Sequence, residues 1–236
     1  MIRAILFDKD GTLLDFDATW RGFVREVLTG LVPGDGPDRA ALRDRLSDIA
    51  GLDPVSGRFR AGSPIVAGST AEVAAIWAAE LPGADARRIE IEANRRAAEA
   101  AQAGPQPAAP DMAGLMAGFR ARGLKLGIAT HDAEAPARAH MAALGIAEAF
   151  DFVAGYDSGH GLKPGPGMVL AFAEAVGVAP GEVAMIGDSI HDLGAGRAAG
   201  AGLVVGVLTG PADAATLAPG ADHVIASIAD LPALLG

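Results

Sequence analysis

Residues 2–15 read IRAILFDKDGTLLD, and this stretch already indicates the kind of fold. Its first part, Ile2–Phe7, is a largely apolar run of the kind that forms a strand buried on both faces. Asp8 ends the run, and Asp10 follows two residues later. At the two-residue period of a strand these carboxylates would point to the same side, where they repel each other and require a cation. Taken alone, the residues also fit an ordinary Asp-Gly turn at the end of a strand.

Further short apolar runs follow, each closed by polar residues or glycine, and helical patterns lie between them. This alternation predicts βαβ units and a doubly wound parallel sheet, which is an α/β fold. Right-handed crossovers bring the carboxyl ends of such strands to one edge of the sheet, where open α/β folds bind ligands. The later strands are expected at Leu124–Ala129, Phe150–Ala154, Val183–Ile186, Leu203–Val207 and His223–Ile225, and the helices at Met112–Arg122, Ala135–Leu144, Gly167–Val176 and Leu193–Ala199.

The alternation is interrupted after the first strand by a long segment with mostly helical patterns. Ser69 and Glu72 have the spacing of a capping box at the start of one of these helices. The piece GPQPAAP, residues 104–110, is typical of a linker that returns to the sheet. We therefore predict an α/β core made of residues 1–15 and 106–236, with an all-helical cap domain inserted at residues 16–105. The inserted helices are expected at residues 18–31, 38–49, 70–80 and 86–102, with a loop rich in Gly, Pro and Arg at residues 51–68.

The composition excludes several classes of function. The chain has 236 residues, half of them apolar, and its 19 basic and 29 acidic side chains give a formal charge of −10. This length supports a sizeable core, and the acidic balance argues against nonspecific binding of nucleic acid. Without cysteine, disulfides and thiolate metal sites are excluded. No apolar stretch has the length of a signal sequence or a membrane span, so we expect a soluble, cytoplasmic protein without a membrane partner.

Three more groups of polar residues follow the expected strands. Thr130 and His131 come after the second strand, where a hydroxyl and backbone N–H groups at a helix start can hold an anion. Lys163 stands in a loop before a helix, and Asp188 and Asp192 are one helical turn apart in GDSIHD. Each group also has a simpler interpretation, as a helix cap or a solvated lysine. Together they would converge on one edge of the sheet, and this mixture suits Mg²⁺ with a phosphate bridging metal and lysine.

The motifs FDKDGTLLD, IATHD, GLKPGPG and MIGDSIHD resemble, in order and over the whole chain, those of the haloacid dehalogenase superfamily. Within it the chain is similar to the phosphoglycolate phosphatase-type hydrolases, whose cap lies where this chain has its helical insertion. The resemblance implies Mg²⁺-dependent hydrolysis of a small phosphorylated metabolite. It makes Asp8 the nucleophile that forms an aspartyl-phosphate. It makes Asp10 the general acid and base, with its backbone carbonyl directed at the metal.

The same resemblance implies roles for the other residues. Thr130 and the amide of His131 would hold the phosphoryl oxygens, and Lys163 would neutralise their charge. Asp188 would bind the metal, and Asp192 would help to orient the site without contacting the metal directly. The family often has Asn where this chain has His131, but only the backbone amide is needed for phosphate, so activity should survive.

The sequence also bears on several other functions. A phosphonoacetaldehyde hydrolase needs a Schiff-base lysine in its cap, and residues 16–105 contain no lysine. A haloacid dehalogenase would lack Asp10. A sugar phosphomutase uses both aspartates and stays open, as does a non-catalytic regulatory protein that binds phosphate. The Gly-x-Gly at residues 194–196 matches a dinucleotide site only weakly.

The choice of substrate should depend on the inserted segment. Arginines there could hold a substrate carboxylate such as that of 2-phosphoglycolate. Our hypothesis is that Arg58 or Arg60, in the Gly-rich loop, faces the site. His140 and His223 carry no functional signal, and the sequence leaves open whether the protein is a monomer or a dimer. The candidate arginines are Arg21, Arg25, Arg58 and Arg60.

Overall fold

The computed structural model describes residues 1–68, 70–102 and 105–235. It divides into two compact units, Met1–Phe16 with Gly104–Gly236, and Asp17–Ala103. Ser69 of the expected capping box and Gly104 of the expected linker lie outside the described residues. Within those ranges, every helix is too short or too polar to cross a bilayer.

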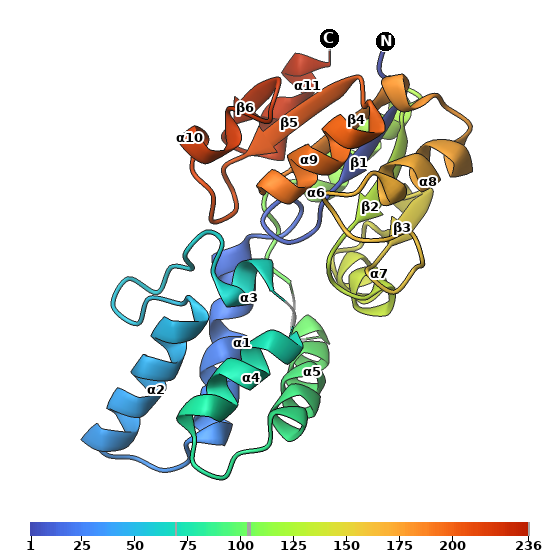
Figure 1. Cartoon of the computed structure of the whole chain (residues 1–236). Coiled ribbons are helices and arrows are strands. Elements are labelled where there is room, and N and C mark those ends of the chain that lie inside the picture. Colours follow the sequence, from blue (N-terminus) through green and yellow to red (C-terminus); the bar gives the residue numbers. More distant parts are fainter. Residues whose placement is uncertain (69, 103–104, 236) are drawn as a thin grey trace. The chain divides into compact units, whose positions relative to one another are not determined.

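The first unit is built on six parallel strands in the order β3-β2-β1-β4-β5-β6 (Figure 1). The predicted doubly wound α/β fold is thereby confirmed, and the expected strand ends agree to within two residues. The chain winds outward from β1 in one direction and then returns to its other side with β4, so the switch point of the fold lies between these two strands. The strands are β1 Ala4–Phe7, β2 Lys125–Ala129, β3 Phe152–Ala154, β4 Val183–Gly187, β5 Leu203–Val207 and β6 His223–Ile225.

The central strand β1 is buried on both faces, and its residues alternate between two cores. Ile5 and Phe7 pack with side chains of α6 (Met112–Ala121) and α7 (Glu134–Ala143). Ala4 and Leu6 pack with side chains of α8 (Gly167–Val176) and α9 (Ile190–Ala199). Burial of each large side chain stabilises the fold by about 1.5–3 kcal/mol. This alternation also decides to which side the next residue, Asp8, is directed.

The second unit is helical, as expected for the segment between β1 and β2. Its core includes Trp77, whose buried indole N–H donates to the Leu46 carbonyl at 2.9 Å. The loop expected at residues 51–68 ends in one additional helical turn, which begins with Pro64. Proline is favoured at that position because its missing N–H would have no partner there. The helices of this segment are α1 Phe16–Leu31, α2 Pro37–Ala50, α3 Pro64–Ala67, α4 Thr70–Glu80 and α5 Ala86–Gln102.

Short elements complete the first unit. Three are 3-10 turns and two are helices of four residues. They are η1 Ala147–Ala149, η2 Pro180–Glu182, α10 Ala214–Leu217, η3 Ile228–Asp230 and α11 Leu231–Leu234.

Candidate active site

Asp8 lies directly beyond the carboxyl end of β1, at the switch point of the sheet. Its N–H donates to the Ile186 carbonyl of β4 at 2.8 Å, which continues the pairing of the two strands. Because Asp8 continues the alternation of Ala4 and Leu6, its buried side chain comes to the side of α8 and α9. Asp188 follows the adjacent strand β4, so the two carboxylates come together at one edge.

Asp192 is held in place by the first turn of α9. The Ser189 hydroxyl caps this helix and accepts a bond from the Asp192 N–H at 3.3 Å. In return, Asp192 Oδ2 accepts a bond from the Ser189 N–H at 3.0 Å. This reciprocal capping orients the carboxylate and leaves Oδ1 to interact with residues outside the helix.

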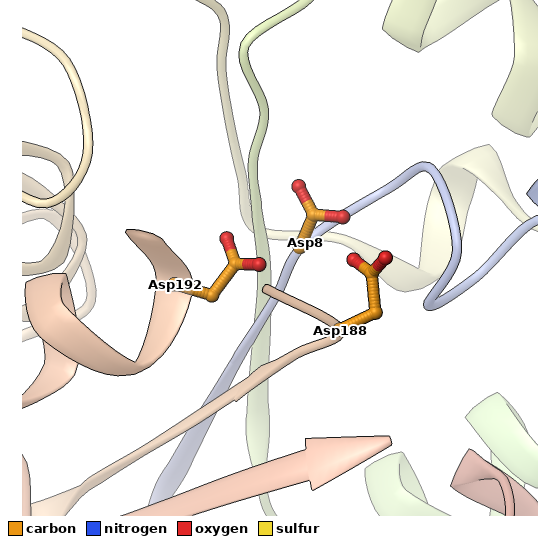
Figure 2. A group of neighbouring side chains, drawn as sticks. All are labelled: Asp8, Asp188 and Asp192. Atoms are coloured by element: carbon orange, nitrogen blue, oxygen red, sulfur yellow. The ribbon is translucent and has the colours of Figure 1, made fainter. Parts of the chain in front are cut away.

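Figure 2 shows that Asp8, Asp188 and Asp192 form one group of three carboxylates. Each is buried, and each offers an oxygen that lies within 4.8 Å of those of the other two. Carboxylate oxygens are the ligands that hard divalent cations prefer. The donor set is therefore consistent with a site for a hard divalent cation.

Lys163 provides the positive charge beside this group. From the loop before α8, its Nζ donates to Asp8 Oδ1 at 2.7 Å, to Asp192 Oδ1 at 2.5 Å and to the Ala129 carbonyl at 2.9 Å. Burial would lower the pKa of this ammonium, but Asp192 and Asp8 raise it above its usual value. Lys163 is thus a permanent cation that links the ends of β1 and β2 to α9.

One lysine does not balance three buried carboxylates. Burial raises the pKa of Asp8 to about 7, opposed by Lys163 and reinforced by Asp192. Burial, together with the charges of Asp8 and Asp192, also raises the pKa of Asp188 well above its usual value. The site therefore favours binding of an additional positive charge, either protons or a metal ion.

Thr130 and His131 follow β2 at the same edge of the sheet. The buried Thr130 hydroxyl accepts a bond from the Asp132 N–H at 3.0 Å, which shapes the turn into α7. The His131 ring lies 6.0 Å, between centroids, from the His191 ring. Burial and the charge of Lys163 lower the pKa of His131 to about 4, so its imidazole is neutral near pH 7.

The Asp10 carboxylate does not join the group of three, contrary to the simple expectation from the strand period. Strand geometry ends at Phe7, and the chain turns tightly at Gly11, which has a φ of +84°. Asp10 Oδ2 instead lies 2.5 Å from Lys9 Nζ. Its predicted role in proton transfer, and that of its backbone carbonyl toward a metal, stay predictions.

Three residues near Asp10 were missed as functional candidates: Lys9, Asp132 and His140. Lys9 is fully buried, and its ammonium also lies near Asp132 and His140. One sequence signal could have found it. Lys9 occupies a position that continues the core-facing alternation of Ile5 and Phe7, and a lysine there requires buried partners.

Arg58 and Arg60, the two arginines proposed to face the site, pair with carboxylates of the helical unit. Arg58 Nε lies 3.7 Å from Asp17 Oδ2, and Arg60 Nη1 donates to Asp48 Oδ1 at 2.9 Å. The Arg58 side chain is 75% exposed, so this ion pair contributes little to stability. The hypothesis that one of them contacts the substrate stays a prediction.

Comparison with known proteins agrees with this geometry. A family model described as haloacid dehalogenase-like hydrolase matches residues 2–200. The chain belongs to this family. The predicted resemblance to this family of hydrolases is thereby confirmed.

Individual proteins are also similar to this chain. The chain is 32% identical over 211 residues to a phosphoglycolate phosphatase of Rhodospirillum rubrum, covering 87% of this chain and 79% of the relative. The crystal structure of a predicted phosphoglycolate phosphatase from Haemophilus somnus matches with a TM-score of 0.75 at 17% identity, over 100% of this chain and 98% of the other. A beta-phosphoglucomutase from Clostridium difficile matches with a TM-score of 0.64 at 20% identity, over 98% and 93%. At these identities the two structures show the fold alone.

Proposed function

We propose that this haloacid dehalogenase-like hydrolase is a Mg²⁺-dependent phosphatase of small phosphomonoesters. The observation that carries the proposal is the contact of Lys163 with Asp8 beside two further buried carboxylates. A carboxylate approaches a phosphate dianion only where positive charge screens their repulsion. Asp8 and Asp188, with the backbone carbonyl of Asp10, would hold Mg²⁺, which supplies such charge when bound.

The proposed reaction has two chemical steps. In the first, an Asp8 oxygen forms a bond to phosphorus while the bond to the alcohol oxygen breaks, and Asp10 gives that oxygen a proton. In the second, Asp10 takes a proton from water, whose oxygen attacks phosphorus and releases Asp8 and inorganic phosphate. Lys163 neutralises charge on the phosphoryl oxygens throughout, and Thr130 with the His131 amide donates hydrogen bonds to them.

We further propose that the substrate is acidic, similar to 2-phosphoglycolate. The R. rubrum relative named phosphoglycolate phosphatase supports this choice. Arg58 or Arg60 of the inserted segment would bind the substrate carboxylate.

A phosphate-release assay tests the proposal. The substrates are 2-phosphoglycolate, several sugar phosphates and glycerol phosphates, each assayed with Mg²⁺ and with EDTA. We expect release that requires Mg²⁺ and is lost in Asp8→Asn, whereas Asp35→Asn, which changes an exposed loop aspartate, should behave as wild type.

Two results would oppose the proposal. Folded protein with Mg²⁺ that releases no phosphate, but isomerises a sugar phosphate, would be a phosphomutase. Protein that binds phosphate without any turnover would be a regulatory binding protein.

A further inference from the structure

Lys9 is a buried lysine that the proposed reaction does not use. It stands between Asp8 and Asp10, and none of its side chain is exposed to solvent. Whereas Asp8 contacts Lys163 from the loop before α8, Lys9 contacts His140 of α7. The two buried lysines, Lys9 and Lys163, therefore contact different acids at the end of the same strand.

The partners of Lys9 come from separate parts of the chain. Its Nζ lies 2.5 Å from Asp10 Oδ2, 3.2 Å from Asp132 Oδ2 and 3.3 Å from His140 Nδ1. Asp132 belongs to the loop after β2, and the buried His140 belongs to α7. Besides Asp10, the ammonium is thus contacted by one loop residue and one helix residue from distant parts of the chain.

The charges of this cluster are consistent with a fixed ammonium. Burial would lower the pKa of Lys9, but Asp10 and Asp132 raise it above its usual value. Burial and the charge of Lys9 lower the pKa of His140, so its imidazole is neutral and Nδ1 can accept a bond. Packing alone does not account for such an arrangement, since a methionine or leucine would fill a core position without desolvating a charge.

We propose that Lys9 is a positioning residue for Asp10, with Asp132 and His140 holding its ammonium in place. The inference rests on the proposed phosphatase and deepens it. Lys163 contacts the nucleophile Asp8, while Lys9 orients the Asp10 carboxylate, which exchanges protons with the leaving oxygen and with water. Without Lys9, Asp10 keeps its chemistry but samples other orientations.

The dependence on the leaving group tests this role. An aryl oxide such as p-nitrophenolate leaves with little need of a proton, whereas an alkoxide needs one from the general acid. We expect Lys9→Met to lower kcat/KM for glycerol phosphate by about 30- to 100-fold. For p-nitrophenyl phosphate, kcat/KM should fall by less than about threefold. Lys125→Met is the matched control, because Lys125 is an exposed lysine on the neighbouring strand, and it should change neither value.

Milder variants keep the test decisive if Lys9→Met does not fold. Asp132→Asn and His140→Gln each loosen one partner of Lys9, and we expect a selective loss of about three- to tenfold on glycerol phosphate. His223→Gln is the control for the histidine, since His223 is exposed.

The outcomes separate the inference from the function on which it rests. Equal losses on both substrates, or no loss on either, would overturn the positioning role while the phosphatase stands. A wild-type protein that hydrolyses neither substrate would overturn the proposed function, and the role of Lys9 with it.

Discussion

Thr209 and Gly11, which are 198 residues apart in the chain, are joined by a hydrogen bond of 2.6 Å from the threonine hydroxyl to the glycine carbonyl. The bond fixes the loop after β5 against the turn after β1. Gly210, the next residue, lies against the Asp188 carboxylate, and a Cβ built on it would overlap Asp188 Oδ2. A Cβ on Gly11 would overlap the same oxygen. The backbones of Gly11 and Gly210 thus lie so close to the Asp188 carboxylate that neither position has room for a side chain.

Gly210→Ala should therefore weaken metal binding. The added methyl group must displace Asp188, and we expect the affinity for Mg²⁺ to fall at least about tenfold, measured by calorimetric titration. Gly118→Ala is the control, because a Cβ at this helical position in α6 meets no atom within 4 Å. The control should bind Mg²⁺ as wild type and gain about 0.5–1 kcal/mol of stability. Unchanged Mg²⁺ affinity in Gly210→Ala would contradict the close contact with Asp188.

Lys163→Met should destabilise the metal-free protein at pH 8. The change leaves Asp8 and Asp192 buried without their shared cation, and breaking such a pair costs about 3–5 kcal/mol. Unfolding in urea with EDTA measures the effect. Adding Asp192→Asn should restore part of the loss, whereas Lys125→Met at the surface should change stability by less than about 0.5 kcal/mol. If Lys163→Met were as stable as wild type, the carboxylates of Asp8 and Asp192 would have to be solvated in the variant, and the prediction would be wrong.

Asp8→Asn should stabilise the metal-free protein at pH 8 and have little effect near pH 4. The pKa of Asp8 is raised from 3.8 to about 7, so between these values the folded state holds a proton that the unfolded state has lost. The contribution of Asp8 to stability therefore falls as the pH rises from about 4 to about 7. We expect a gain on the order of 2 kcal/mol at pH 8. The lowered pKa of His131 has the opposite effect on the pH dependence of stability. Because wild type and variant share His131, the difference between their free energies of unfolding reports Asp8 alone.

Mg²⁺ affinity should rise with pH over the same range. Protons and the metal compete for the carboxylates, and the pKa values of both Asp8 and Asp188 are raised. Titrations at pH 6 and pH 8, in two buffers of different ionisation enthalpy, should show tighter binding at pH 8 and proton release at pH 6. Binding that is independent of pH would place the metal away from these two residues.

Arg58→Ala or Arg60→Ala should raise KM for acidic substrates specifically. If the guanidinium holds a substrate carboxylate, its loss should raise KM for 2-phosphoglycolate by about tenfold or more. KM for neutral phosphomonoesters should stay unchanged. Arg87→Ala, which changes an exposed arginine of α5, is the control. Equal effects on acidic and neutral substrates would exclude a role in carboxylate recognition.

Much of the fold and of the candidate site follows from local patterns. The apolar runs predicted six strands, because a strand buried on both faces needs apolar residues at successive positions. Asp8 and Asp188 could be placed at one edge, because right-handed crossovers leave parallel strands with their carboxyl ends together. Lys163 stands in a loop, where a lysine usually faces solvent, and only its contacts with Asp8 and Asp192 show its burial.

The sequence by itself determined the α/β fold, the inserted helices and the set of polar residues at the strand ends, since these depend on periodicity and connection handedness. Only the tertiary structure decided that β1 lies beside β4 and that the Asp10 carboxylate turns to Lys9. It also paired Lys9 with His140, which is 131 residues away and carried no signal in the sequence. The physical reason is that a buried charge takes whichever partners the packed elements bring within reach, and a local pattern contains no record of them.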